Sequence, residues 1–152
     1  MTAKNNIRDY LFVGIQFVLF GLYVFEWLPR VKVPAAVLVL GITAAGAGLL
    51  TAFLSVLNLN RNLTVFPTPK KNAELVQTGL YRWVRHPIYS GILLSAFAFA
   101  AGTGSQHKLL TAIALLILFY FKTAYEEKRL AEHYREYADY RKRTGRFFPK
   151  FF

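Results

Sequence analysis

The sequence predicts an all-α integral membrane protein with four transmembrane helices, a cytoplasmic C-terminal helix and no Rossmann domain. Three observations support this prediction. Of the 152 residues, 55% are hydrophobic and 16% aromatic, and the mean hydropathy of +0.31 is high for a soluble domain. The apolar residues gather in four runs whose lengths approach the thickness of a bilayer core. The charged residues lie between these runs, and no glycine-rich nucleotide loop follows a strand pattern.

The composition also narrows the possible functions. The formal net charge of +11 would suit nucleic-acid binding, but the charge lies in segments between apolar runs, so we expect no nucleic-acid partner. The chain has no cysteine, which excludes disulfides, thiolate metal ligands and cysteine nucleophiles. The three histidines, His86, His107 and His133, are far apart in sequence, and we expect no metal site.

The first two apolar runs cover residues 10–28 and 33–57. Gln16 and Glu26 are the strongly polar members of the first run. Lys4 and Arg8 precede it as in a signal peptide, but no small-x-small cleavage pattern follows, so we expect a retained helix. The second run is long enough to cross a bilayer with tilt, and its segment "LGITAAGAG" is typical of close helix packing.

The third and fourth runs, 88–103 and 109–125, are near the lower length limit for spanning. A helix rises about 1.5 Å per residue, and the bilayer core is about 30 Å thick. The short link "GTGSQH" between them predicts an antiparallel hairpin. Four spans place every Lys and Arg except Arg30, Lys32 and Lys108 on one side, so the positive-inside rule predicts that both termini are cytoplasmic.

The loop 58–87 joins the second and third spans. Pro67 and Pro69 forbid a continuous helix there, and Gly79 predicts a turn. Pro87 suits the first turn of the third span, so we expect His86 at or near its N-cap. The free N–H groups of that helix start favour an anionic group such as a carboxylate.

The tail 126–152 reads as a continuation of the fourth helix into the cytoplasm, with Leu130, Tyr134 and Tyr137 on one face and Gly145 as the stop. Two interpretations remain open. The tail is either a basic amphipathic helix lying on anionic lipid, or part of a site that includes the paired Glu126 and Glu127 at the membrane exit.

The predicted hairpin brings His86 and Tyr89 near Glu126 and Glu127 at one membrane depth, under the proline-broken loop. Carboxylates suit an ammonium group or ribose hydroxyls, and the helix N-terminus suits a carboxylate, so such a pocket fits a zwitterionic ligand of amino-acid type. A transporter would place its polar groups at mid-span, whereas these lie at span ends.

Two motifs in this region carry a resemblance. "LVQTGLYRWVRHPIYSG" is followed, about 40 residues after its histidine, by "EEKRLAEHYREYADYRKRTGRFFP". Together they resemble the isoprenylcysteine carboxyl methyltransferase family and the related phospholipid N-methyltransferases, over about residues 58–149. The resemblance implies a multi-pass membrane methyltransferase that uses S-adenosylmethionine, releases S-adenosylhomocysteine and acts on a lipophilic acceptor. We expect it in a bacterial or archaeal cytoplasmic membrane.

The resemblance also implies which residues form the site. Lys122 occupies the place of an arginine that contacts substrate in eukaryotic members, but lysine lacks the two-pronged grip of arginine. Lys122 and Arg85 are therefore substrate-side candidates, and the alternatives are that Lys122 extends to the headgroups and Arg85 faces lipid phosphate. No catalytic residue is assigned. The residues implied to bind the cofactor are Ala73, Glu74, Leu75, Val76, Tyr81, His86, Pro87, Ile88, Tyr89, Glu126 and Glu127.

The identity of the acceptor stays open at this stage. A carboxylate or thiolate acceptor needs no general base, whereas an amine must first be deprotonated, and the spans carry no dedicated base. This favours a carboxylate or a thiolate over an amine, and the main expectation is the carboxylate of an isoprenylcysteine or another isoprenoid. Methylation of phosphatidylethanolamine or of a thiol is the alternative, and a non-enzymatic lipid-binding or accessory subunit is the rival from another class. The oligomeric state is also open.

Overall fold

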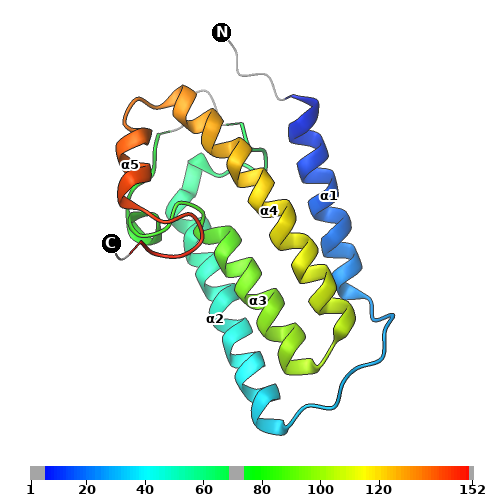
Figure 1. Cartoon of the computed structure of the whole chain (residues 1–152). Helices are drawn as coiled ribbons and strands as arrows, with labels where there is room; N and C mark the ends of the chain where they lie inside the picture. Colours follow the sequence, from blue (N-terminus) through cyan, green and yellow to red (C-terminus); the bar gives the residue numbers. More distant parts are fainter. Residues whose placement is uncertain (1–5, 69–73, 151–152) are drawn as a thin grey trace.

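A computed structural model describes residues 6–68 and 74–150. Within these ranges the regular secondary structure is helical, apart from two isolated β-bridges. The chain runs through the four long helices in an up-and-down order, and a short fifth helix follows (Figure 1). The elements are α1 (Ile7–Val24), α2 (Ala35–Leu59), the 3-10 helices η1 (Asn60–Asn62) and η2 (Gly79–Arg82), α3 (Pro87–Thr103), α4 (Gln106–His133) and α5 (Tyr137–Arg143).

The long helices are those of a membrane protein. In the part of the chain that the structure describes, α1, α2 and α4 are long and apolar enough to cross a bilayer, and α3 is a shorter apolar helix of 17 residues. The start of α1, the connection between α2 and α3, and α5 lie at one end of the bundle, and the α1–α2 and α3–α4 connections lie at the other (Figure 1). The predicted antiparallel hairpin of the third and fourth runs is confirmed.

The boundaries of the fourth helix differ from the prediction of 109–125. The helix begins three residues earlier, because the Ser105 hydroxyl caps it by accepting from the Lys108 N–H at 3.1 Å. It also continues to His133. The prediction that the tail continues this helix is therefore confirmed as far as His133 and is wrong beyond it, since α4 ends there and α5 begins at Tyr137 after a turn. The turn allows Tyr137 and Tyr140 to point inward, where both are buried.

Helices α2 and α3 pack closely through glycines, as the small-residue segment predicted. A methyl group added at Gly41 would lie 2.4 Å from the Cα of Gly102, and one added at Gly48 would lie 2.6 Å from the carbonyl oxygen of Gly91. The two helix backbones are therefore in direct contact at two levels. Gly46 has open space around it and takes no part in this contact.

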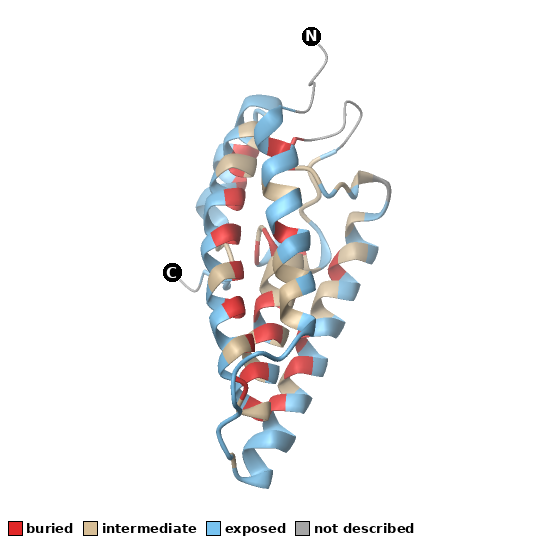
Figure 2. Cartoon of the chain, turned by 90° about the vertical axis from the view of Figure 1, so that its right-hand side faces the viewer, coloured by how far each residue is buried: buried red, intermediate tan, exposed pale blue. Residues whose placement is uncertain are grey.

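Buried residues follow one stripe along α4, at spacings of three and four residues (Figure 2). At mid-helix the stripe is apolar, and Leu115, Leu118 and Phe119 form a core cluster with Leu93 of α3. Toward both ends the stripe becomes polar, with Lys108 at one end and Lys122 and Glu127 at the other. Lys122 and Glu127 lie at the end of α4 that is near α5, and both are in or beside the site described below.

The tail after α5 lies across the beginning of α3. The backbone N–H groups of Arg85 and His86 donate to the carbonyl oxygens of Gly145 and Arg146 at 2.9 and 3.1 Å. The hydroxyl of Ser90 donates to the carbonyl oxygen of Phe147 at 2.7 Å. These bonds join segments about 60 residues apart and hold α5 beside the start of α3.

Candidate functional site

A cavity of about 310 Å³ lies at the end of the bundle where α3 begins and α4 ends. It is enclosed by α1, α2, the connection between α2 and α3, the first turns of α3, the last turns of α4, and α5. Its lining is apolar over most of its area, with a few convergent polar groups, which is the usual character of a small-molecule site. The polar residues that line it are Gln16, Asn62, Thr64, Glu74, Tyr81, Arg85, His86, Tyr89, Lys122, Glu126, Tyr134, Tyr137 and Tyr140.

His86 is the N-cap of α3 and Pro87 is its first residue, as the sequence predicted. The proline at this position forgoes no helical hydrogen bond, and its fixed φ angle starts the helix. The His86 side chain is 5% exposed and stacks on the ring of Tyr89, with the centroids 5.8 Å apart. The imidazole is therefore held at the positive end of α3, against the cavity.

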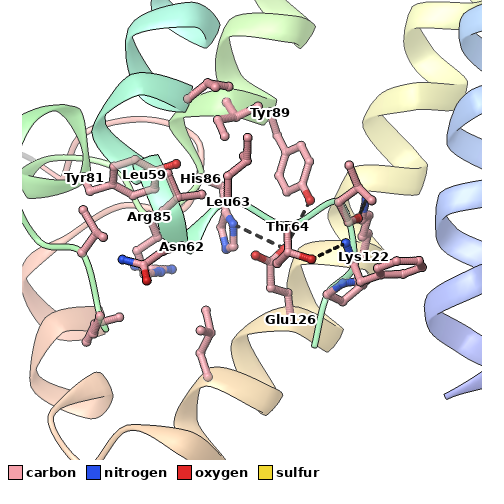
Figure 3. A pocket seen from close by; sticks show the side chains of 18 of the residues that line it. Leu59, Asn62, Leu63, Thr64, Tyr81, Arg85, His86, Tyr89, Lys122 and Glu126 are labelled. Atoms are coloured by element: carbon pink, nitrogen blue, oxygen red, sulfur yellow. Dashed lines mark hydrogen bonds and ion pairs between the residues drawn. The ribbon is translucent and has the colours of Figure 1, made fainter. Parts of the chain in front are cut away.

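Glu126 on α4 faces these two residues across the cavity. Its carboxylate accepts a hydrogen bond from the Tyr89 hydroxyl at 3.3 Å and lies 3.9 Å from Nδ1 of His86. Figure 3 shows the three side chains converging on one point. The structure thus brings together the histidine, the tyrosine and the first glutamate of the pair, which are up to 40 positions apart in the sequence.

Glu127 has different surroundings, because consecutive helical residues point in different directions. Its carboxylate accepts from Arg85 Nε at 2.9 Å, and it lies 3.3 Å from His86 Nε2, 3.4 Å from Arg146 and 3.6 Å from Arg141. We call these five residues the Glu127 cluster. Glu127 and Pro87 are the described members of the predicted set that do not line the cavity.

Arg85 links the Glu127 cluster to the tail. Besides its bond to Glu127, the guanidinium donates to the carbonyl oxygens of Thr144 and, at 3.2 Å, of Arg141. Its side chain is mostly buried, so the alternative that Arg85 merely faces lipid phosphate does not describe it. Arg85 both lines the cavity and fixes the residues that follow α5.

Lys122 is buried on the α1 side of the cavity. Its ammonium nitrogen donates to Gln16 Oε1 at 2.6 Å and to the carbonyl oxygen of Val65 at 3.2 Å, and it lies 5.3 Å from the centre of the Tyr89 ring. The side chain is 1% exposed, so it does not extend to the headgroups. A buried cation in a membrane protein usually either pairs with polar groups of the protein or takes part in a functional site.

The connection between α2 and α3 supplies one wall. Glu74, Leu75, Val76 and Tyr81 line the cavity, and so does Ile88 at the start of α3. The connection is tied to α1 because the hydroxyl of Thr68 donates to the carboxylate of Asp9 at 2.7 Å. Ala73, which the resemblance also implied, lies outside the described residues.

Several cavity residues were not singled out by the sequence. Gln16 was visible as a polar residue within an apolar run, but nothing in the sequence indicated its contact with Lys122. Tyr137 and Tyr140 were assigned to the tail, where a lipid-facing surface remained an alternative. Burial raises the pKa of Tyr140 to about 12 and raises that of Tyr137 further, so both phenols keep their protons and are available as hydrogen-bond donors.

Within residues 6–68 and 74–150, no group of three or more His, Cys, Asp or Glu side chains is placed to hold a metal ion. The polar groups of the cavity instead combine a carboxylate, an imidazole, a helix N-terminus and a buried ammonium. Such a set can bind a ligand that carries both charges, with apolar surface around it.

Two curated proteins are similar to part of this chain. A nickel-cobalt-cadmium resistance protein, NccN, from Alcaligenes xylosoxydans xylosoxydans is 34% identical over 87 residues. A cobalt-zinc-cadmium resistance protein, CzcN, from Cupriavidus metallidurans is 34% identical over 82 residues. Each match covers 53% of this chain and 38% of the relative, so the chain spans well under half the length of the relatives that it matches.

The sequence profile of the phospholipid methyltransferases matches residues 36–137, which is more than half of the chain. The match begins in α2, includes the connection, the α3–α4 hairpin and Glu126, and ends at the first residue of α5. It therefore contains most of the elements that enclose the cavity, and it agrees with the family resemblance of the two motifs. The chain belongs to the phospholipid methyltransferase family, which includes the isoprenylcysteine carboxyl methyltransferase-like proteins.

Proposed function

We propose that this protein is a membrane methyltransferase that binds S-adenosylmethionine in the cavity and methylates a lipophilic acceptor. Membership of a methyltransferase family supports the reaction class. The observation that carries the proposal is the convergence of His86, Tyr89 and Glu126 on one point of the cavity wall, at the N-terminus of α3.

The residues present fit the proposed cofactor. The carboxylate of Glu126 matches the ammonium group of the cofactor's amino-acid part, and the free N–H groups at the start of α3 match its carboxylate. Leu75, Val76 and Leu130 offer apolar surface for the adenine ring. The cavity thus pairs each polar part of the cofactor with a group of complementary charge and covers the rest with apolar side chains.

The chemistry asks little of the protein beyond positioning. When bound, the cofactor supplies a methyl group on a positively charged sulfur, which an electron-rich acceptor atom can attack without further activation. The chain's own residues must hold both partners in line and exclude water. His86, Tyr89 and Glu126 hold one end of the site, and the buried Lys122 and Gln16 lie on the side next to α1.

We propose a carboxylate as the acceptor group, carried by an isoprenylcysteine-like or other isoprenoid molecule. Lys122 supports this choice, because its ammonium group inside the cavity would attract a carboxylate and repel a protonated amine. A phospholipid amine and a thiol are the alternatives. The names of the two similar proteins refer to metal resistance, and among the described residues no group of three or more His, Cys, Asp or Glu side chains is placed to hold a metal ion.

We further propose that all four long helices cross the membrane and that both termini are cytoplasmic. The arrangement of the helix ends supports an even number of crossings (Figure 1). Among the described residues, Arg30, Lys32 and Lys108 are the basic residues near the end of the bundle opposite α5, and the other described basic residues lie toward the end that holds the cavity. The cofactor would then enter from the cytosol, and the acceptor would enter from the bilayer.

Calorimetric titration of S-adenosylhomocysteine into the detergent-purified protein tests the cofactor site. We expect micromolar affinity for the wild type and a loss of at least about tenfold in Glu126→Gln, because removal of the charge removes about 1.4 kcal/mol or more of an ionic hydrogen bond. Glu132→Gln is the matched control, since Glu132 lies on the same helix with its side chain 54% exposed.

The rival interpretation, a non-enzymatic lipid-binding or accessory subunit, predicts no binding by a well-folded wild type. If the wild type binds, methyl transfer from labelled cofactor to a farnesylated cysteine analogue, to phosphatidylethanolamine and to an alkyl thiol identifies the acceptor class. Labelling of phosphatidylethanolamine alone would overturn the carboxylate assignment.

A further inference from the structure

Tyr137, the first residue of α5, is a fully buried residue whose hydroxyl group has no hydrogen-bond partner among the described residues. Its relative exposure is 1%, and it is one of the residues that line the cavity. A buried hydroxyl group without a partner costs free energy and is uncommon in folded proteins. Its presence on a cavity wall therefore needs an explanation.

The neighbouring tyrosine on the same helix shows what a satisfied hydroxyl looks like here. The Tyr140 hydroxyl donates to the carbonyl oxygen of Tyr81 at 2.7 Å, which joins α5 to η2. The rings of Tyr137 and Tyr140 pack edge to face, with centroids 5.9 Å apart. Both side chains thus lie on α5 and are buried, and they differ in whether a described residue of the protein accepts a hydrogen bond from the hydroxyl group.

The position of Tyr137 is fixed by the surrounding structure. Arg85 holds the carbonyl oxygens at the C-terminal end of α5, and Arg141 on α5 belongs to the Glu127 cluster. Because these two contacts fix α5, the helix cannot easily rotate to bring the Tyr137 hydroxyl group to another acceptor. The hydroxyl group therefore stays at the cavity wall with its donor capacity unused.

The Tyr137 hydroxyl group also keeps its proton throughout the physiological pH range, so it can donate a hydrogen bond. Burial raises its pKa well above the ordinary value, and the nearby carboxylate of Glu127 raises it further, while Arg85 opposes the rise. A protonated phenol seeks an acceptor, and a nucleoside cofactor offers ring nitrogens, ribose oxygens and a carboxylate.

We propose that Tyr137 is a cofactor-positioning residue, whose hydroxyl group donates a hydrogen bond to an acceptor atom of the nucleoside cofactor bound in the cavity. This inference rests on the proposed function. It extends the site from the histidine and glutamate motifs to α5, so that the cofactor contacts the α3 start, the end of α4 and the tail together. Ligand binding would then supply a partner that the described part of the ligand-free protein does not offer.

The test compares affinity with stability in Tyr137→Phe. Because the hydroxyl group has no hydrogen-bond partner among the described residues of the ligand-free protein, its removal should leave the melting temperature of that protein unchanged or slightly higher. The dissociation constant for S-adenosylhomocysteine, measured by calorimetry, should rise about 5- to 20-fold. Tyr120→Phe is the control, since its side chain is 55% exposed on α4 and does not line the cavity.

Three outcomes would overturn the inference. One is wild-type affinity in Tyr137→Phe. The second is a lower melting temperature with unchanged affinity, which would assign the hydroxyl group a structural role. The third is a folded wild type that does not bind the ligand at all, which would overturn the proposed function as well. Failure of Tyr137→Phe to fold has the same meaning as the second outcome, which is a structural role for the hydroxyl group.

Discussion

Lys122 on α4 donates a 2.6 Å hydrogen bond to the side-chain oxygen of Gln16 on α1, across 106 positions of the sequence. Both side chains are buried, and both line the cavity. The contact matters because the family profile begins at residue 36, so α1 lies outside the matched region. The N-terminal helix therefore contributes directly to the wall of the candidate site.

Gln16→Leu should destabilise the protein. Among the described residues, the substitution leaves Lys122 with the Val65 carbonyl oxygen as its remaining hydrogen-bond acceptor, and loss of a buried hydrogen bond to a charged group costs about 1.5–3 kcal/mol. Denaturant or thermal unfolding in detergent measures the change. In a Lys122→Met background the same Gln16→Leu substitution should cost much less, since no buried amine then lacks a partner. Equal costs in both backgrounds would contradict this explanation.

Arg85→Lys should loosen α5 and weaken cofactor binding. Lysine keeps the charge but cannot reach Glu127 and the two carbonyl oxygens of Arg141 and Thr144 at once. We expect faster amide hydrogen exchange over residues 137–147 and a loss of about 5- to 10-fold in S-adenosylhomocysteine affinity, which is about 1–1.4 kcal/mol. Arg82→Lys, at an exposed position of η2, is the control.

Hydrogen exchange separates the two possible roles of Arg85. If the tail exchanges at the wild-type rate while the acceptor KM rises, Arg85 contacts the acceptor and the positioning role is wrong. If the tail alone changes and cofactor affinity does not, α5 is not part of the binding wall.

The arrangement of the long helices could be predicted because it depends on hydrophobic length and on a few local signals. The apolar runs fix where helices lie, Pro87 fixes where α3 begins, and the short link fixes the α3–α4 hairpin. These features are local in the sequence. From them follows the meeting of His86 and Tyr89 with Glu126, which needs only the hairpin geometry.

Other features depend on contacts that no local pattern encodes. The break between α4 and α5 has no glycine or proline, and the turn is stabilised by burial of Tyr137 and Tyr140 against η2 and the cavity. The different roles of Glu126 and Glu127 depend on the rotation of α4 about its axis. The Gln16–Lys122 contact depends on how α1 packs against α4.

Gly91→Ala should destabilise the bundle through the α2–α3 contact. The added methyl group would lie 2.5 Å from the carbonyl oxygen of Gly48 and 2.6 Å from the backbone nitrogen of Ala52, so the helices must move apart. Overpacking of this kind costs about 1–3 kcal/mol. Thermal unfolding in detergent measures the loss.

Gly46→Ala is the matched control, because open space surrounds Gly46 and alanine is the better helix former. This variant should be as stable as the wild type or more stable. Similar losses in both variants would show that close packing is not the cause.

Glu26→Gln should lower stability at neutral pH and have less effect in acid. The Glu26 carboxylate accepts from the Ser105 hydroxyl at 2.5 Å, from Arg30 at 3.0 Å, and lies 3.5 Å from Lys108, which joins the end of α1 to the start of α4. The hydrogen bond from Ser105, helped by Arg30 and Lys108, lowers the pKa of Glu26 below its ordinary value. A carboxylate whose pKa is lower in the folded state stabilises the fold above its ordinary pKa, and this contribution is lost as the pH falls through the folded value.

The melting temperatures of the wild type and Glu26→Gln should therefore differ most at pH 7 and converge once the pH falls below the folded pKa of Glu26. Glu132→Gln, which removes an exposed carboxylate, should match the wild type at both pH values. If the difference in melting temperature between the wild type and Glu26→Gln stays constant from pH 7 into acid, the contact depends on the shape of the side chain and not on its charge.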